Sequence, residues 1–301
     1  MIYTVTFNPA LDYVVHASSF VIGETNRADR EELQMGGKGI NVSLILRELD
    51  ADSVALGFLA GRTGSLLREW VESAGVKCDF IELPEGMTRI NVKLKGSTET
   101  ELNGKGPAIP DSAVRDLFQN LDGLAAGDTL VVSGSIPSSL PDHIYEDILA
   151  RLDGKDIRFV VDATGKLLEN VLPYHPFLIK PNHQELGDIC GVKLEASDTQ
   201  AVVDCAKQLQ AKGARNVLVS MAGAGALLLT EDGQVLRREA ARGVLKNSVG
   251  AGDSMVAGFL AGYERGGYEE ALRLGTAAGG ATAFSDRLGT KAEIDNVYKS
   301  L

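Results

Sequence analysis

The chemistry that this sequence offers is concentrated in residues 247–260, where small residues precede a predicted helix. Gly250, Ala251 and Gly252 can turn their backbone N–H groups outward at the positive end of that helix, where phosphate oxygens are stabilised. Asp253 follows directly, so its carboxylate would lie within reach of a bound phosphoryl group and could take the proton of an attacking hydroxyl. The segment therefore predicts an anion hole with an adjacent general base.

A structural role for Asp253 is the alternative, because Asp is a common helix N-cap. A cap would not require three small residues before it, nor Ala257 and Gly258 one turn later, which permit close packing beneath the loop. These details favour a functional role, although the sequence leaves the capping alternative open.

A second glycine run, Gly36, Gly37, Lys38 and Gly39, precedes another predicted helix. Glycines let the backbone approach a ligand closely, Lys38 supplies a cation for an anionic substrate, and the Asn41 amide can pair with sugar hydroxyls. A purely structural turn would explain such a run equally well. Neither a GxGxxG motif after a strand nor a GxxxxGK[ST] motif occurs, which disfavours the dinucleotide-binding fold and the P-loop.

A third candidate, Asp12, follows the first predicted strand. Its carboxylate could hold sugar hydroxyls or only shape a turn, and the sequence favours neither interpretation.

Hydrophobic patterning predicts the scaffold that must position these residues. Short β-branched runs predict buried strands, and the segments between them have helical spacing. Strands are expected at 2–7, 53–58, 129–133, 158–162, 177–180 and 216–220, and helices at about 39–49, 141–151, 167–172 and 199–212. This alternation predicts a mostly parallel sheet with helices on both faces.

Several predicted strands end in a polar or small residue: Asn8, Ser133, Asp162, Lys180 and Ser220. Ligands of open α/β sheets bind beyond the carboxyl ends of the strands, so these residues could face a common site. Strands also end at polar residues without any functional reason, which is the plainer explanation.

Residues 13–34 and 89–103 alternate between polar and apolar side chains instead of forming continuous apolar runs. Such alternation is typical of a half-exposed antiparallel sheet. We expect a small lid inserted into the main domain and able to cover a site.

Composition narrows the class of protein. The formal net charge of −11 disfavours nucleic acid as a partner. Cys78, Cys190 and Cys205 form no CxxC pair, which predicts reduced cysteines and a cytoplasmic location. The sequence begins without a basic and apolar leader and contains no stretch long enough to span a bilayer, so we expect neither secretion nor membrane insertion.

Taken together, six segments resemble the signatures of the PfkB family of ribokinase-like carbohydrate kinases, and the resemblance covers essentially the whole chain. The segments are 8–12, 36–41, 88–91, 133–137, 180–185 and 250–253. Within the family, the lysine of the glycine run and the Thr-Arg-Ile-Asn-Val-Lys segment are most similar to 1-phosphofructokinases, followed by tagatose-6-phosphate kinases.

The resemblance implies an α/β fold, a ribokinase-like three-layer sandwich with a mostly parallel central sheet and a small β-sheet lid. It also implies a single kinase domain over residues 1–301 with lid excursions at about 13–34 and 89–103. The lid of this family often forms a dimer interface, which suggests a homodimer.

The resemblance likewise implies roles for individual residues. Asp253 would be the catalytic base, with Gly250, Ala251 and Gly252 as the anion hole. Substrate contacts would come from Asp12, Gly37, Asn41, Arg89 and Ser135, while Lys38 and Arg27 of the lid would grip the existing phosphate of the substrate.

On the nucleotide side, the resemblance implies ATP and Mg²⁺ as cofactors. Lys180, Asn182 and Glu185 would serve the phosphates and the magnesium ion, with Glu185 acting on the metal through water. Small residues would line the adenine and ribose slot, namely Ser220, Gly225, Ala277 and Gly280.

The expected activity is ATP-dependent phosphorylation of fructose 1-phosphate at its 6-hydroxyl. The same chemistry on the 1-hydroxyl of tagatose 6-phosphate or fructose 6-phosphate is the nearest alternative. A sugar-phosphate sensor without turnover is an alternative of a different class, which the complete anion hole and the base disfavour.

Overall fold

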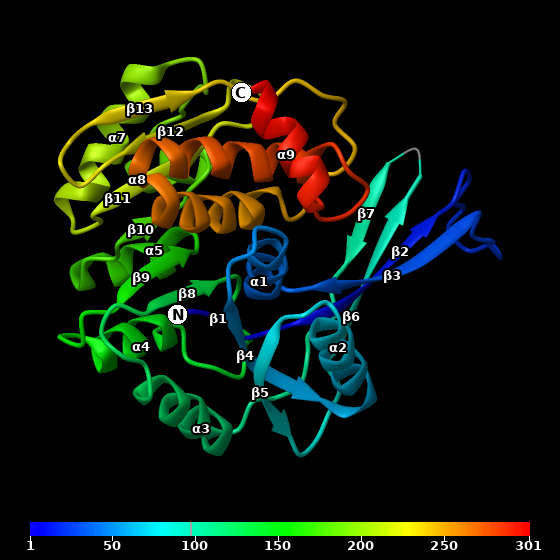
Figure 1. Ribbon diagram of the computed structural model, residues 1–301. Helices are drawn as coiled ribbons and strands as arrows, with labels where there is room; N and C mark the ends of the chain where they lie inside the picture. Colours follow the sequence, from blue (N-terminus) through cyan, green and yellow to red (C-terminus); the bar gives the residue numbers. More distant parts are fainter. Residues whose placement is uncertain (97) are drawn as a thin grey trace.

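A nine-stranded sheet forms the middle layer of the computed structural model, which describes residues 1–96 and 98–301 (Figure 1). Its strands in spatial order are β13 (Val235–Arg238), β12 (Ala226–Leu229), β11 (Asn216–Ser220), β10 (Leu178–Ile179), β9 (Arg158–Asp162), β8 (Thr129–Ser133), β1 (Ile2–Thr6), β4 (Ser53–Ala60) and β5 (Lys77–Leu83). Neighbouring strands from β5 to β11 run parallel to one another. At the other edge, β12 pairs antiparallel with β11, and β13 pairs antiparallel with β12. The prediction of a mostly parallel sheet is confirmed.

Helices cover both faces of this sheet, as predicted. One face carries α1 (Lys38–Glu48), α2 (Gly61–Ser73), α8 (Ala251–Ala283) and α9 (Lys291–Ser300), and the other carries α3 (Asp111–Asp122), α4 (Ile144–Leu152), α5 (Gly165–Val171), α6 (His183–Cys190) and α7 (Thr199–Ala211). Alternating strand residues serve the two layers: Val131 and Val160 pack with α1 and α8, whereas Val132 and Val161 pack with α4 and α5. These strands are apolar on both faces because both faces are buried.

A second, four-stranded sheet extends away from the main body as the lid (Figure 1). Its order is β3 (Arg30–Gly36), β2 (Ala10–His16), β6 (Arg89–Lys95) and β7 (Glu99–Leu102). Residue 97, inside the predicted 89–103 excursion, lies outside the described residues.

The expectation of a fully antiparallel lid is wrong for its central pair, because β2 and β6 run parallel with Asp12 opposite Asn91. The reason is topological. β2 follows β1 and β6 follows β5, and these two strands of the main sheet point the same way, so both lid strands start from the same edge.

Helix α8 begins at the predicted anion-hole loop and changes direction at Gly266 and Gly267, whose backbone angles are not helical. The helix predicted after the small-residue loop therefore corresponds to the first half of α8. Among the described residues, none of the helices combines the length and the apolar character that a membrane crossing requires.

Candidate active site

A cavity of about 1330 Å³ opens at the carboxyl ends of the parallel strands. It is lined by the last residues of β1, β8, β9 and β11, which are Thr6, Ser133, Asp162 and Ser220, and by Lys180 directly after β10. Single small ligands typically occupy about 300–1,000 Å³, so this cavity has room for two ligands side by side.

Most of the predicted site residues line this one cavity. They are Asp12, Gly37, Lys38, Asn41, Arg89, Ser135, Lys180, Asn182, Glu185, Ser220, Gly225, Gly250, Ala251, Gly252, Asp253 and Gly280.

The N-terminus of α8 forms the floor of the cavity. Gly250 is the N-cap and has a φ of 80°, in the left-handed region that favours glycine. A Cβ at this position would also lie 2.7 Å from Leu288 Cδ2. No side chain among the described residues caps α8. The N–H of Ala251 donates to the backbone oxygen of Ser248 at 3.3 Å, whereas the N–H groups of Gly252 and Asp253 have no partner among the described residues and remain available to an anion.

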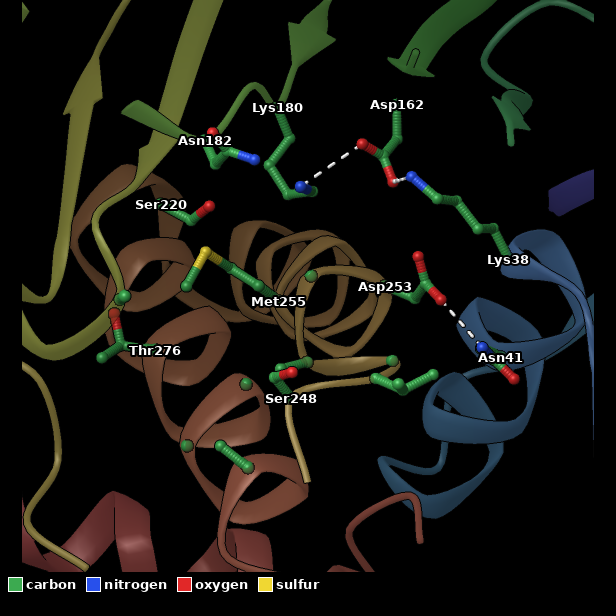
Figure 2. Close-up of a pocket in the computed structure, with 18 of the residues that line it drawn as sticks. Lys38, Asn41, Asp162, Lys180, Asn182, Ser220, Ser248, Asp253, Met255 and Thr276 are labelled. Carbon is green, nitrogen blue, oxygen red and sulfur yellow. Dashed lines mark hydrogen bonds and ion pairs between the residues drawn. The ribbon is translucent and has the colours of Figure 1, made fainter. Parts of the chain in front are cut away.

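Asp253 is the third residue of α8, and its carboxylate is buried with 5% of the residue exposed. It accepts a hydrogen bond of 2.8 Å from Asn41 Nδ2 on α1 instead of capping its own helix (Figure 2). Burial, followed by the negative charge of Asp162, raises the pKa of Asp253 to about 7, while Lys38, Asn41 and Lys180 oppose that rise. A carboxyl group with this pKa is matched to general-base work at neutral pH.

The buried carboxylate of Asp162 forms ion pairs with two ammonium groups. Its Oδ2 lies 3.1 Å from Lys38 Nζ and its Oδ1 lies 3.3 Å from Lys180 Nζ. Burial alone would raise the pKa of Asp162, but the two lysines outweigh burial and hold this pKa below its usual range. We call these three residues the lysine–aspartate cluster. From the sequence, Asp162 was recognisable only as a polar strand end without a role.

The lid contributes a second buried network to the cavity. Asp12 on β2 accepts a hydrogen bond of 2.8 Å from Asn91 Nδ2 and forms an ion pair of 3.0 Å with Lys93 Nζ, both on β6. Asn91 and Lys93 were not predicted as site residues. The available signal was strand alternation, since these two residues share the face that carries Asp12.

Arg89, at the start of β6, donates hydrogen bonds to two backbone carbonyls. Its Nε lies 3.1 Å from the oxygen of Asn8, and its Nη1 lies 3.3 Å from that of Gly104. The guanidinium is therefore held at the base of the lid, where it lines the cavity.

Asn182 and Glu185 form a capping box at the start of α6. Asn182 Oδ1 accepts from the N–H groups of Gln184 and Glu185 at 2.9 Å, and Glu185 Oε2 accepts from the N–H of Asn182 at 2.8 Å. The capping box occupies one oxygen of each side chain. Within the described residues, no cluster of three or more His, Cys, Asp or Glu side chains is arranged to hold a metal ion.

Gly225, which lines the cavity, stands where the backbone leaves no room for a side chain. Its φ is 92°, and a Cβ there would lie 2.0 Å from the backbone oxygen of Arg238. Any larger residue would push the turn between β11 and β12 away from the backbone of residues 238–240.

Two predicted site residues lie elsewhere. Ala277 is fully buried in the core against the sheet, so its expected place in the slot is wrong. Helical spacing explains the error: Thr276, Gly279, Gly280 and Ala283 of α8 face the cavity, and position 277 points about 100° away from position 276. Arg27 lies exposed in the connection between β2 and β3, at the outer end of the lid.

Met255 and Thr276 are cavity residues that sequence analysis missed. Figure 2 shows both near Ser220, on the side of the cavity away from Asn41. Met255 follows Asp253 by two positions, and its apolar character gave no signal beyond an ordinary core residue.

The chain is similar to proteins of known family over nearly its whole length. The model of the pfkB family of carbohydrate kinases matches residues 5–294. A 1-phosphofructokinase of Bacillus subtilis is 46% identical over 298 residues, which cover 99% of this chain and 97% of the relative. A D-tagatose-1-phosphate kinase of Bacillus licheniformis is 36% identical over 302 residues, covering 100% of this chain and 98% of the relative.

Among solved structures, phosphofructokinase-2 of Escherichia coli in complex with substrates and products superimposes with a TM-score of 0.91. It is 27% identical, and the match covers 99% of this chain and 98% of that chain.

Proposed function

We propose, from the premise that this chain belongs to the pfkB family of carbohydrate kinases, that it phosphorylates fructose 1-phosphate on the 6-hydroxyl with ATP. The products would be fructose 1,6-bisphosphate and ADP. The three-layer sandwich with a lid is the ribokinase-like fold of these kinases. The observation that carries the catalytic part of the proposal is the buried Asp253, whose pKa is raised to about 7 beside the uncapped N-terminus of α8.

The reaction needs one proton transfer and one phosphoryl transfer. The Asp253 carboxylate would take the proton of the sugar hydroxyl as the oxygen attacks the γ-phosphorus of ATP, and the bond to the β-phosphate oxygen would break to release ADP. The N–H groups of Gly250, Ala251 and Gly252 would stabilise the charge on the transferred group. Asn41 holds the base in place through its hydrogen bond to Asp253.

On the sugar side, we assign contacts with the hydroxyls and the carbon chain of the sugar to four residues: Asp12, Gly37, Asn41 and Ser135. Arg89 would bind the phosphate that the substrate already carries, because a fixed guanidinium can bind phosphate through two hydrogen bonds. Arg27 lies on the lid away from the cavity, so its role as a second contact to that phosphate remains a prediction.

Lys38 is better assigned to the transferred phosphoryl group than to the existing phosphate of the substrate. Its ammonium lies 3.1 Å from Asp162, and the charges that raise its pKa against burial are those of Asp162, Asp253 and Glu185. These charges support a role for Lys38 at the transferred group rather than at the lid.

On the nucleotide side, we assign Lys180 and Asn182 to the ATP phosphates and Ser220, Gly225 and Gly280 to the adenine and ribose slot. Mg²⁺ would neutralise charge on the phosphates. Glu185 fits a water-mediated contact to it, because Mg²⁺ binds through few carboxylates and retains water, and the capping box leaves Oε1 of Glu185 outside its bonds.

A substrate panel tests the proposed specificity. We expect the highest kcat/KM for fructose 1-phosphate when it is compared with fructose 6-phosphate, tagatose 6-phosphate and tagatose 1-phosphate in a coupled ADP-release assay. The similarity to a D-tagatose-1-phosphate kinase makes tagatose 1-phosphate the most informative competitor. Equal kcat/KM values, or a preference for a 6-phosphate, would overturn the choice of sugar.

The pH dependence follows from the raised pKa of Asp253. The base works only when it is ionised, so kcat/KM should fall about tenfold per pH unit below a pH near the pKa of about 7. A pH–rate profile between pH 5 and 9, at subsaturating sugar, measures this limb. A limb near pH 4, the ordinary value for aspartate, would contradict the assignment.

We also propose that residues 1–301 act as one kinase domain and form a homodimer through the outer face of the lid. Strand pairing places Leu33, Ile90 and Leu102 on the face opposite Asp12, and 43%, 37% and 71% of these residues are exposed. Such a row of apolar side chains favours association.

Sedimentation tests the dimer. The wild type should sediment near twice its chain mass of 31.9 kDa, and Leu33→Glu combined with Leu102→Glu should give the single-chain mass, because a buried charge opposes association. A wild type that remains a monomer at micromolar concentration would refute the interface. The cytoplasmic location remains a prediction, with which the free cysteines Cys78, Cys190 and Cys205 agree.

A further inference from the structure

Asp162 is the most deeply buried charge of the cavity that the mechanism above does not use. It ends β9, its side chain is 4% exposed, and each of its carboxylate oxygens faces one lysine. The two lysines arrive from distant segments, Lys38 from the first position of α1 and Lys180 from the end of β10 (Figure 2). One carboxylate therefore fixes two long, flexible side chains relative to each other.

The lysine–aspartate cluster lies directly beside the proposed anion hole. A Cβ on Gly252 would be 3.1 Å from Lys180 Nζ, which measures how closely this ammonium approaches the α8 loop. The stem of Lys38 runs along Gly134, whose added Cβ would be 3.8 Å from Lys38 Cγ. Figure 2 shows Asp253 between the cluster and Asn41.

We propose that Asp162 is a positioning residue for phosphoryl transfer, holding the ammonium groups of Lys38 and Lys180 where they face the transferred phosphoryl group. This inference rests on the proposed kinase function. Without the carboxylate, two neighbouring ammonium groups would repel each other, and both side chains would regain rotamer freedom. Catalytic groups misplaced by about 1 Å can lose about a hundredfold in rate, so the position of the lysines matters as much as their charge.

A purely structural ion pair is the competing interpretation, because buried carboxylates often serve folding alone. The two interpretations differ in kinetics. A structural Asp162 would change stability but leave the kcat of the folded enzyme intact. A positioning Asp162 would change kcat while the KM values for sugar and ATP stay close to those of the wild type.

Asp162→Glu separates them, since it keeps the charge but moves the carboxylate by one methylene. We expect kcat to fall at least about tenfold from the displaced lysines, with both KM values within about threefold of wild type. The acid limb of the pH–rate profile should stay in place, because the negative charge near Asp253 is retained.

Asp162→Asn removes the charge and adds a second readout. The groups facing Asp253 are Asp162 from β9, Lys38 and Asn41 from α1, and Lys180 after β10. Removing the one negative charge among them lowers the pKa of Asp253, so the acid limb should move to lower pH while kcat falls. If the acid limb of the pH–rate profile stays in place, the charge of Asp162 does not act on Asp253, and the proposed arrangement of the cluster beside the base is wrong.

Asp162→Glu decides the matter if Asp162→Asn does not fold, because it preserves the net charge of the cluster. A kcat within about twofold of wild type for Asp162→Glu would reject the positioning role. Asp122→Asn is the matched control: its exposed pair with Arg151 lies outside the cavity, and its kcat should be unchanged. Asp253→Asn, assayed in parallel, separates the two failures: if it is inactive while Asp162→Glu is fully active, the kinase proposal stands and only this inference falls.

Discussion

Asp253→Asn should lower the turnover number by at least about a hundredfold while fructose 1-phosphate and ATP still bind, because general bases contribute about 10²–10⁴ in rate. The substituted amide keeps the volume of the side chain, and its oxygen can still accept the hydrogen bond from Asn41. It cannot take a proton from the sugar hydroxyl. The measurement is kcat from ADP release, together with dissociation constants from titration calorimetry.

Asp295→Asn, the same change at an exposed position of α9, is the control and should leave kcat unchanged. Full turnover by Asp253→Asn would refute the mechanism. The variant also discriminates a kinase from a sugar-phosphate sensor, since a sensor has no turnover for this substitution to remove.

Lys38→Met should lower kcat by about 10² with the KM for sugar phosphate nearly unchanged, as for the loss of one preorganised group that stabilises transition-state charge. The Lys38 ammonium is paired with Asp162 near the base, so its loss affects the transferred group rather than the resident phosphate of the sugar. Methionine retains an apolar stem of similar length. Thermal unfolding should be measured alongside the kinetics, because the substitution removes one of the two ammonium groups that pair with Asp162 among the described residues.

Arg89→Ala is the comparison for Lys38→Met and should behave in the opposite way, raising the KM for the sugar phosphate about tenfold with a smaller effect on kcat. The family resemblance led us to expect Lys38 at the resident phosphate, which would give Lys38→Met the same KM defect. If both variants changed only KM, the sequence-based role of Lys38 would be correct and the structural assignment wrong.

Local patterns predicted much of the fold. Continuous apolar runs marked β1, β4, β8, β9 and β11, because strands buried on both faces need apolar residues throughout. The edge strand β13 was missed, since its exposed side chains interrupt any such run. The parallel pairing of β2 with β6 was also missed, because it depends on where two distant segments leave the main sheet.

The sequence by itself determined the small-residue loop before Asp253, the glycine run before α1 and the alternation of strands and helices. Each of these signals lies within a few neighbouring residues, where backbone preference and hydrophobic periodicity act. Only the tertiary structure decided the partners of the charged groups: Asn41 meets Asp253 across 212 positions, and Lys38 meets Asp162 across 124. Burial and neighbouring charge set the chemistry of a carboxyl group, and both arise only when the chain has folded.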